Sequence, residues 1–164
     1  LHTYHLFFQE KEPILPEDNV GTLYERLMKK GSELVLKTIE AIAKGEFQTQ
    51  VQNEANALHH APKVFKETCE IDWSRSALDI HNLVRGLSPY PAAWTKLDGK
   101  ICKIYRTAKL DKDYPNLKAG EYFSDGKSQL IFQTGKKSLQ ILELQLEGKK
   151  RLGIEEFLRG FKIP

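Results

Sequence analysis

The second half of this chain consists of short apolar stretches separated by turn signals, a pattern that limits it to a small antiparallel β fold. Asp98-Gly99 is typical of a two-residue type I′ hairpin turn, and Asp125-Gly126 and Gly135 divide the stretches that follow. We expect strands at 92–97, 101–109, 120–123, 129–133 and 139–146, and a closing helix at 154–159. This order predicts a mostly β, α+β fold: an OB-like Greek-key β-barrel with flanking helices.

The period of two along a strand assigns side chains to faces. Lys103 and Tyr105 are expected on one face of their strand, and Ile104 and Arg106 on the other. The last strand divides in the same way, with Leu139, Ile141 and Glu143 against Gln140, Leu142 and Leu144.

A helix is expected just before the β region. Ser74 is a good N-cap residue, and Gly86 and Pro89 end the helix. Pro89-Tyr90-Pro91 then predicts a stiff extended corner. The apolar face recurs at helical spacing through Ala77, Ile80, Leu83, Val84 and Leu87.

The N-terminal region reads as a strand over 6–12 followed by a helix that Asp18 or Thr22 caps. Gly31 is expected to kink or divide this helix, because glycine costs about 1 kcal/mol in a helix interior. Gly45 is a good stop. The apolar stripe is Val20, Leu23, Tyr24, Leu27, Leu34, Val35, Ile39 and Ile42.

Charge is divided unevenly along the chain. Residues 1–73 hold 8 Lys/Arg and 12 Asp/Glu, a balance of −4, and residues 74–164 hold 17 and 10, a balance of +7, which together give the net +3. A basic half attracts nucleic acid or an anionic surface. A lysine-coated domain without such a partner is the alternative reading of the same charges.

The sequence predicts neither membrane insertion nor a metal centre. No apolar run approaches the ~18 residues that span a bilayer, and the N-terminus lacks a signal-peptide layout. Cys69 and Cys102 form no CxxC pair, and His59 and His60 are adjacent, so they would not converge on one metal ion. A reducing cytoplasm is the expected location.

Lysine and arginine side chains are the best candidates for binding phosphate groups. The candidate nucleic-acid-binding residues are Lys100, Lys103, Arg106, Lys136, Lys137, Lys149, Lys150 and Arg151. The last three are expected on the loop before the final helix. Trp73, Trp94 and Tyr90 could stack on bases, although packing between helix and barrel is the expected role.

Four short motifs together resemble the C-terminal part of methionyl-tRNA formyltransferase. The resemblance covers about residues 9–161. The motifs are Ala61-Pro62-Lys63, Ile71-Asp72-Trp73-Ser74, the corner from Arg85 to Pro91, and Leu144-Gln145 with Gly148-Lys149-Lys150. The resemblance implies that 1–45 is the helical remnant of a Rossmann-like catalytic domain, 46–70 a linker, and 71–164 the OB-like domain that helps to hold tRNA.

The resemblance also implies a reaction: transfer of a formyl group from 10-formyltetrahydrofolate to methionyl initiator tRNA. The family's catalytic Asn, His and Asp are not matched here, since Thr3-Tyr4-His5 stands where the Asp-containing stretch is expected. Residues 1–8 therefore read as foreign or altered sequence. We expect this chain to be inactive alone and to hold no cofactor of its own.

Two other functions fit the same resemblance. One is a related formyltransferase that acts on folate or nucleotide-sugar substrates. The other is a protein-interaction module that associates with itself through residues 20–43. The resemblance implies that the apolar stripe there would pack on a sheet that is mostly missing from this chain.

Overall fold

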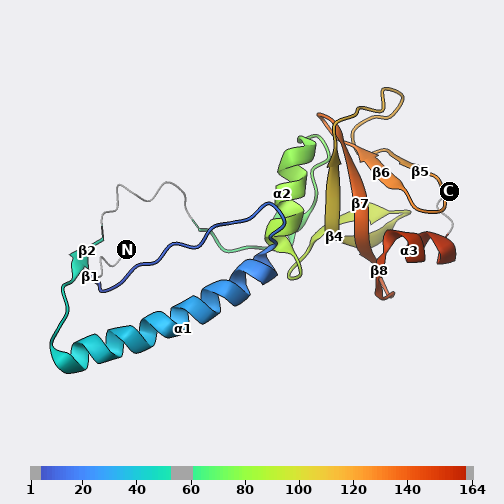
Figure 1. Ribbon diagram of the computed structural model, residues 1–164. Coiled ribbons are helices and arrows are strands. Elements are labelled where there is room, and N and C mark those ends of the chain that lie inside the picture. The colour runs from blue at the N-terminus through green and yellow to red at the C-terminus, as the bar shows by residue number, and fades with distance from the viewer. Residues whose placement is uncertain (1–4, 53–60, 162–164) are drawn as a thin grey trace. The chain divides into compact units, whose positions relative to one another are not determined.

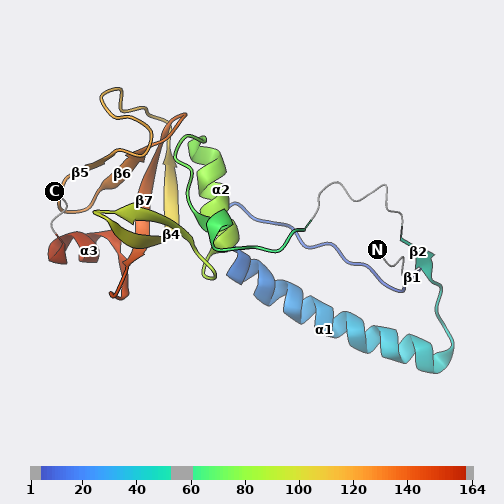
Figure 2. The same ribbon diagram turned by 180° about the vertical axis from the view of Figure 1, so that it is seen from behind.

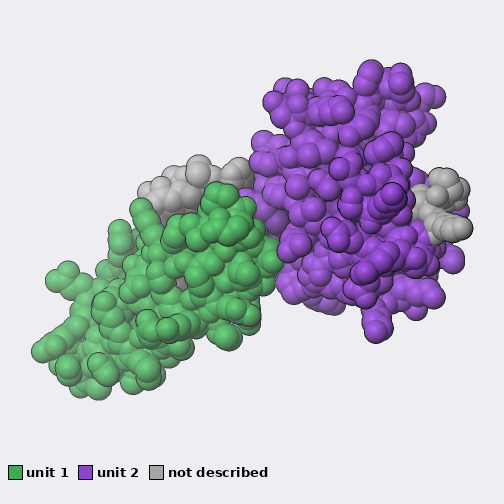
Figure 3. Space-filling view, turned by 45° about the vertical axis from the view of Figure 1, so that its right-hand side comes forward, with its two compact units in different colours: residues 1–63 green, residues 64–164 purple. Residues whose placement is uncertain are grey.

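The computed structural model describes residues 5–52 and 61–161 and divides the chain into two compact units, 1–63 and 64–164 (Figure 3). The second unit is an antiparallel sheet with two helices (Figure 1). Its strands are β3 (Ala93–Leu97), β4 (Lys100–Leu110), β5 (Tyr122–Ser124), β6 (Leu130–Gln133), β7 (Ser138–Leu146) and β8 (Arg151–Gly153).

The strand order confirms the Greek-key expectation. Neighbouring strands run β3-β4-β7-β6-β5, and β8 pairs with β7. Strands β5, β6 and β7 are linked by hairpins, while β4 reaches its place beside β7 through a long connection. The sheet curls as an OB-like half-barrel in which, among the described residues, β3, β5 and β8 each pair with one strand only.

The first hairpin forms as its turn residues predict. Asp98 and Gly99 both take positive φ, at 50° and 74°, which a type I′ turn requires. Strand β8 was not expected, because Lys149–Arg151 read as a loop. The structure places Arg151 in that strand, opposite Gln145.

The expected alternation is wrong along the β4–β7 ladder. Register shifts on both sides of Arg106 leave Tyr105 and Leu142 as extra residues. Each shift reverses the faces beyond it. Leu144 therefore shares the core with Leu139 and Ile141, and Arg106 is exposed although Ile104 is buried.

Helix α2 (Ala77–Leu87) packs its buried residues Ala77, Ile80 and Val84 into the core. Its N-cap is Ser76, which accepts a hydrogen bond from the Asp79 N–H, so the expected cap at Ser74 is wrong. Ser74 instead donates its hydroxyl to Asp72 Oδ1 at 2.6 Å.

The Pro89-Tyr90-Pro91 corner is a turn with two cis peptide bonds and not an extended segment.

Aromatic packing closes the core of the second unit. Trp73 stacks on Phe132 with ring centroids 4.2 Å apart, and its indole N–H donates to Thr95 Oγ1. Packing is thus the role of Trp73, as expected. Helix α3 (Ile154–Gly160) lies against β7 and β8 (Figure 2). Its Phe157 and Leu158 side chains are buried in the core.

The first unit is built around the long helix α1 (Val20–Lys44), with a short antiparallel pair of β1 (His5–Leu6) and β2 (Gln50–Val51). The strand expected over 6–12 is wrong beyond Leu6. Asn19 is the N-cap, in a reciprocal capping box with Thr22. Gly31 does not divide the helix, since one glycine is a small cost over its 25 residues.

The segment before α1 is tied to the helix by ion pairs. Arg26 binds Glu12 at 2.7 Å and Asp18 at 2.6 Å, and Lys30 binds Glu12 at 2.9 Å. Because charged hydrogen bonds favour the carboxylate, the Arg26 guanidinium lowers the pKa of Asp18 well below its usual range. No residue of α1 is buried. Its large exposed apolar residues are Val20, Tyr24, Leu27, Met28, Val35, Leu36, Ile39 and Ile42.

Candidate nucleic-acid interface

One row of side chains crosses four strands on the outer face of the sheet. The register pairs Trp94 of β3 with Lys103 of β4, Lys103 with Gln145 of β7, and Gln145 with Arg151 of β8. We call these four residues the cross-strand row. Adjacent strands lie about 4.8 Å apart, so the row is a continuous strip that carries an aromatic ring, a cation, an amide and a second cation.

The cross-strand row lies on the outer face because the adjacent residues of the same strands are apolar and fill the core. Ala93, Ile104 and Leu144 form the adjacent row and are at most 1% exposed. Burying these apolar side chains stabilises the sheet. The period of two then turns Trp94 and Lys103 outward, where both are partly exposed.

Hydrogen bonds hold the row in position. The Trp94 indole N–H donates to the Lys66 carbonyl at 2.9 Å. Tyr105 donates its hydroxyl to Gln145 Oε1 at 2.7 Å, and Gln145 Nε2 donates to the Lys149 carbonyl at 2.9 Å. Each polar atom of the Gln145 amide therefore makes one hydrogen bond within the protein.

Arg151 is committed to neighbouring side chains. It donates two hydrogen bonds to Glu143, and its guanidinium lies 4.1 Å from the centre of the Tyr105 ring. The Glu143 carboxylate raises the pKa of Arg151, because it stabilises the charged form. Much of the charge of Arg151 is thus neutralised before any phosphate arrives.

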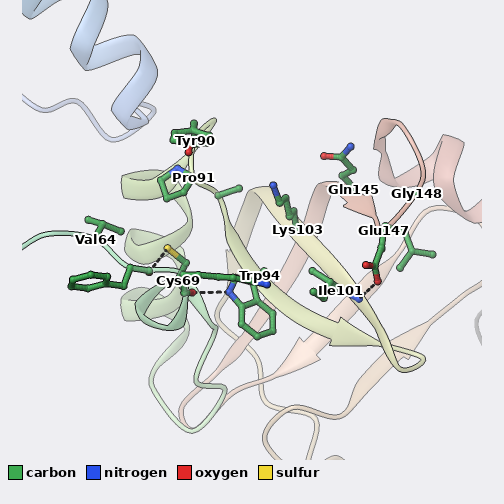
Figure 4. A pocket seen from close by; sticks show the side chains of 14 residues that line it. Val64, Cys69, Tyr90, Pro91, Trp94, Ile101, Lys103, Gln145, Glu147 and Gly148 are labelled. Atoms are coloured by element: carbon green, nitrogen blue, oxygen red, sulfur yellow. Dashed lines mark hydrogen bonds between the residues drawn. The ribbon is translucent and has the colours of Figure 1, made fainter.

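A pocket of about 560 Å³ opens beside the row (Figure 4). Its walls come from the segment that leads into the 3₁₀ turn Glu67–Cys69, from the Pro89–Ala92 corner, from β3 and β4, and from the end of β7. Phe65, Tyr90 and Trp94 supply aromatic rings, and Lys66 and Lys103 supply charge. Tyr90 is 82% exposed.

The structure separates the eight candidate cations into groups. Lys100, Lys103, Lys149 and Lys150 lie toward one end of the β4–β7 ladder, with Arg151. Lys136 and Lys137 lie toward the other end, where Leu110 pairs with Ser138. The rise per residue puts the ends of β7 roughly 25 Å apart. Arg106 lies between the two groups, and the role of all eight in binding phosphate stays a prediction.

Lys137 has acidic partners of its own. Its ammonium lies 3.0 Å from Asp111 and 3.9 Å from Asp113, and the Asp111 carboxylate raises the pKa of Lys137. Lys136 instead follows Gly135 in the turn that contacts the start of α2, where its carbonyl accepts the Ala77 N–H. The two ends of the β4–β7 ladder therefore differ in how far their lysines are engaged within the protein.

Sequence reasoning missed four participants: Phe65, Lys66, Tyr105 and Gln145. Phe65 and Lys66 were assigned to a linker, yet that segment ends at the buried Cys69 and joins the sheet by the Ile71 N–H to Trp94 carbonyl bond. Only the strand register could have placed Tyr105 and Gln145 beside Arg151.

In the described residues no group of His, Cys, Asp and Glu could hold a metal ion, and no helix is long and apolar enough to cross a membrane.

The curled Greek-key sheet and its flanking helices define an OB-like β domain. A family model described as the C-terminal domain of formyl transferases matches residues 63–162. The chain therefore belongs to the formyl transferase C-terminal domain family, and the resemblance to the C-terminal part of methionyl-tRNA formyltransferase is confirmed.

Relatives with similar sequence are methionyl-tRNA formyltransferases. The Bacteroides fragilis protein is 39% identical over 171 residues, covering 99% of this chain and 52% of its own length. The Lactococcus lactis protein is 40% identical over 152 residues, covering 93% of this chain and 47% of its own. This chain thus spans about half the length of the curated relatives it matches.

Solved structures share the fold. HypX from Aquifex aeolicus aligns with a TM-score of 0.63 at 20% identity, covering 92% of this chain and 28% of that one. The sugar 3N-formyl transferase WlaRD aligns with a TM-score of 0.61 at 17% identity, covering 90% and 51%. HypX has also been crystallised with tetrahydrofolic acid.

Proposed function

We propose that this chain is the tRNA-binding C-terminal part of a methionyl-tRNA formyltransferase. In the whole enzyme it would hold methionyl initiator tRNA while the formyl group is transferred from 10-formyltetrahydrofolate. The single observation that supports this best is the 39% identity to such an enzyme over 99% of the chain. Sequence identity to the sugar formyl transferase is only 17%, so a nucleotide-sugar substrate is the weaker alternative.

The lysines at one end of the sheet suit a phosphate backbone. Lys100, Lys149 and Lys150 are exposed, and Lys103 is partly exposed. Within the described residues none of these four makes an ion pair of 4.0 Å or less. Such groups displace condensed counterions from nucleic acid, which supplies affinity without reading sequence.

The lining of the described pocket lacks the residue types that formyl transfer needs. A formyl transfer needs a polarised carbonyl and a proton acceptor for the attacking amine. The pocket has one carboxylate, Glu147, which accepts from the Ile101 N–H, and neither Asn nor His lines it. We therefore propose that the chain alone binds tRNA without formylating it, and that 1–45 is the end of a catalytic domain.

The test is a titration of initiator tRNA at several salt concentrations. Affinity should fall steeply as salt rises, and each of Lys100→Ala, Lys149→Ala and Lys150→Ala should lower the slope of log affinity against log salt by about 1. Lys29→Ala, at an exposed position on α1, is the matched control. Unchanged slopes in all three variants would exclude this end of the sheet as the binding site.

A further inference from the structure

We propose that the pocket beside the cross-strand row holds one unpaired nucleotide of a single-stranded RNA segment, a proposal that rests on the tRNA-binding function above. Its volume, about 560 Å³, falls in the range of sites that enclose small ligands. A base pair within a duplex could not enter, because its faces and edges are covered by stacked and paired neighbours. The occupant is therefore an unstacked base with its ribose and phosphate.

Aromatic side chains form the wall against which the base stacks. Tyr90 is 82% exposed, and the prolines on both sides restrict the backbone that carries it. Phe65 lines the pocket from the segment before the 3₁₀ turn and is 54% exposed. Trp94 is fixed by its bond to the Lys66 carbonyl, as Figure 4 shows. Exposed, pre-positioned rings of this kind bind bases by stacking.

The charge around the pocket suits a nucleotide better than an apolar peptide. Lys66 and Lys103 line it, and Glu147 is the one acidic lining residue. Lys100 and Lys149 adjoin the lining residues Ile101 and Gly148 in the chain. The Ile101 N–H donates to the Glu147 carboxylate at 3.4 Å, so this carboxylate lies beside the start of β4. A phosphate would thus meet several cations beside an aromatic wall.

The pocket is predicted to accept any base. Reading a base edge requires unoccupied donors and acceptors on the protein. Gln145 is already partly engaged, because its Oε1 accepts from Tyr105 and its Nε2 donates to the Lys149 carbonyl. Stacking remains as the main contact, and every base offers a π face.

Two RNA hairpins with the same stem provide the test, one blunt and one with a four-nucleotide unpaired 3′ tail that carries the fluorescent base 2-aminopurine. The full chain should bind the tailed hairpin more tightly and quench the fluorescent base. Tyr90→Ala should reduce affinity for the tailed hairpin about 5- to 100-fold and leave the blunt hairpin unchanged. Tyr90→Phe keeps the ring and should bind as the unmodified chain does, and Tyr24→Ala is the control for loss of an exposed tyrosine.

The outcomes separate this proposal from the proposed function. If Tyr90→Ala binds both hairpins as the unmodified chain does, the pocket is not a nucleotide site, although salt-dependent binding of tRNA would still stand. If the chain binds neither hairpin nor tRNA, both proposals fail. If Tyr90→Ala alters the sedimentation of the chain and not RNA binding, the pocket belongs to a protein contact and the nucleotide proposal is overturned.

Discussion

The guanidinium of Arg151 donates to both carboxylate oxygens of Glu143, at 2.9 and 2.7 Å. This bidentate pair spans β7 and β8 and fixes one end of the cross-strand row. Bidentate contacts of this kind are among the stronger charged hydrogen bonds in proteins. The pair is exposed enough for solvent to screen it. The pair therefore contributes little to stability, and its main effect is on the position of the Arg151 charge and on its availability to a phosphate.

Glu143→Gln tests that assignment. The substitution removes the negative charge that neutralises Arg151, so Arg151 becomes available to a phosphate. Affinity for tRNA should rise, and the salt slope should steepen by about 1. Arg151→Ala in the natural background should change the slope less than Lys149→Ala does. Equal effects of Arg151→Ala and Lys149→Ala would show that Glu143 does not restrain the arginine.

Gly135→Ala should destabilise the second unit by about 2–4 kcal/mol. An added Cβ would lie 1.8 Å from the Ser74 carbonyl oxygen, which is backbone and cannot rotate away. The Gly135 N–H also donates to the Trp73 and Arg75 carbonyls. Chemical denaturation measures the loss. The control is Gly86→Ala inside α2, where nothing lies within 4 Å, and a gain of about 0.5–1 kcal/mol is expected. An unchanged or increased free energy of unfolding in Gly135→Ala would refute the close approach.

Stability should fall as the solution is acidified through the histidine range. Partial burial, with Lys109 and Arg85 nearby, lowers the pKa of His81 below the 6.5 of an unperturbed imidazole. The unfolded chain then takes up this proton at a higher pH than the folded chain does. The contribution of His81 is complete above pH 6.5 and is lost as pH falls through the lowered pKa. His81→Gln should flatten this part of a denaturation series against pH, and an unaltered profile would contradict it.

Both cysteines of the second unit should resist thiol reagents while the chain is folded. Cys69 and Cys102 are each 1% exposed, and burial raises the pKa of Cys102 to about 12. The reactive thiolate is therefore scarce at neutral pH. Mass spectrometry after iodoacetamide treatment should show alkylation only when denaturant is added. Rapid labelling of Cys102 in the native chain would show that the sheet opens locally.

The apolar face of α1 predicts self-association. Leu36, Ile39 and Ile42 are each at least half exposed, and contiguous apolar surface of this kind marks interaction sites. Sedimentation equilibrium should show a mass that exceeds 18.8 kDa as concentration rises. Ile39→Lys should return the chain to a monomer. A monomer at all concentrations in the unmodified chain would exclude the contact.

The sequence predicted the order of strands β3 to β7 because turn residues have specific backbone requirements. Asp98-Gly99 marked the first hairpin, and Gly45 marked the end of α1. The cap at Ser76 was missed because Ser74, two residues earlier, is an equally good capping type. The structure distinguishes them by their hydrogen bonds: Ser76 accepts from the Asp79 N–H, while Ser74 donates to Asp72.

The candidate site was less predictable because it depends on pairing between distant strands. Lys103 and Arg151 were both named as phosphate contacts, but the sequence could not show that Gln145 lies between them or that Glu143 binds the arginine. The register shifts around Arg106 also change which side chains of β4 and β7 face the core. No pattern in the sequence predicts these shifts. Pairing across the sheet is set by the whole core and not by any one strand.

Binding of initiator tRNA by the purified chain across a salt series tests the central claim most directly. The account predicts a measurable affinity in dilute buffer that falls linearly with the logarithm of salt concentration. It also predicts a smaller slope when Lys149 is replaced by alanine. An absence of binding in dilute buffer, or an affinity that stays constant as salt rises, would contradict it.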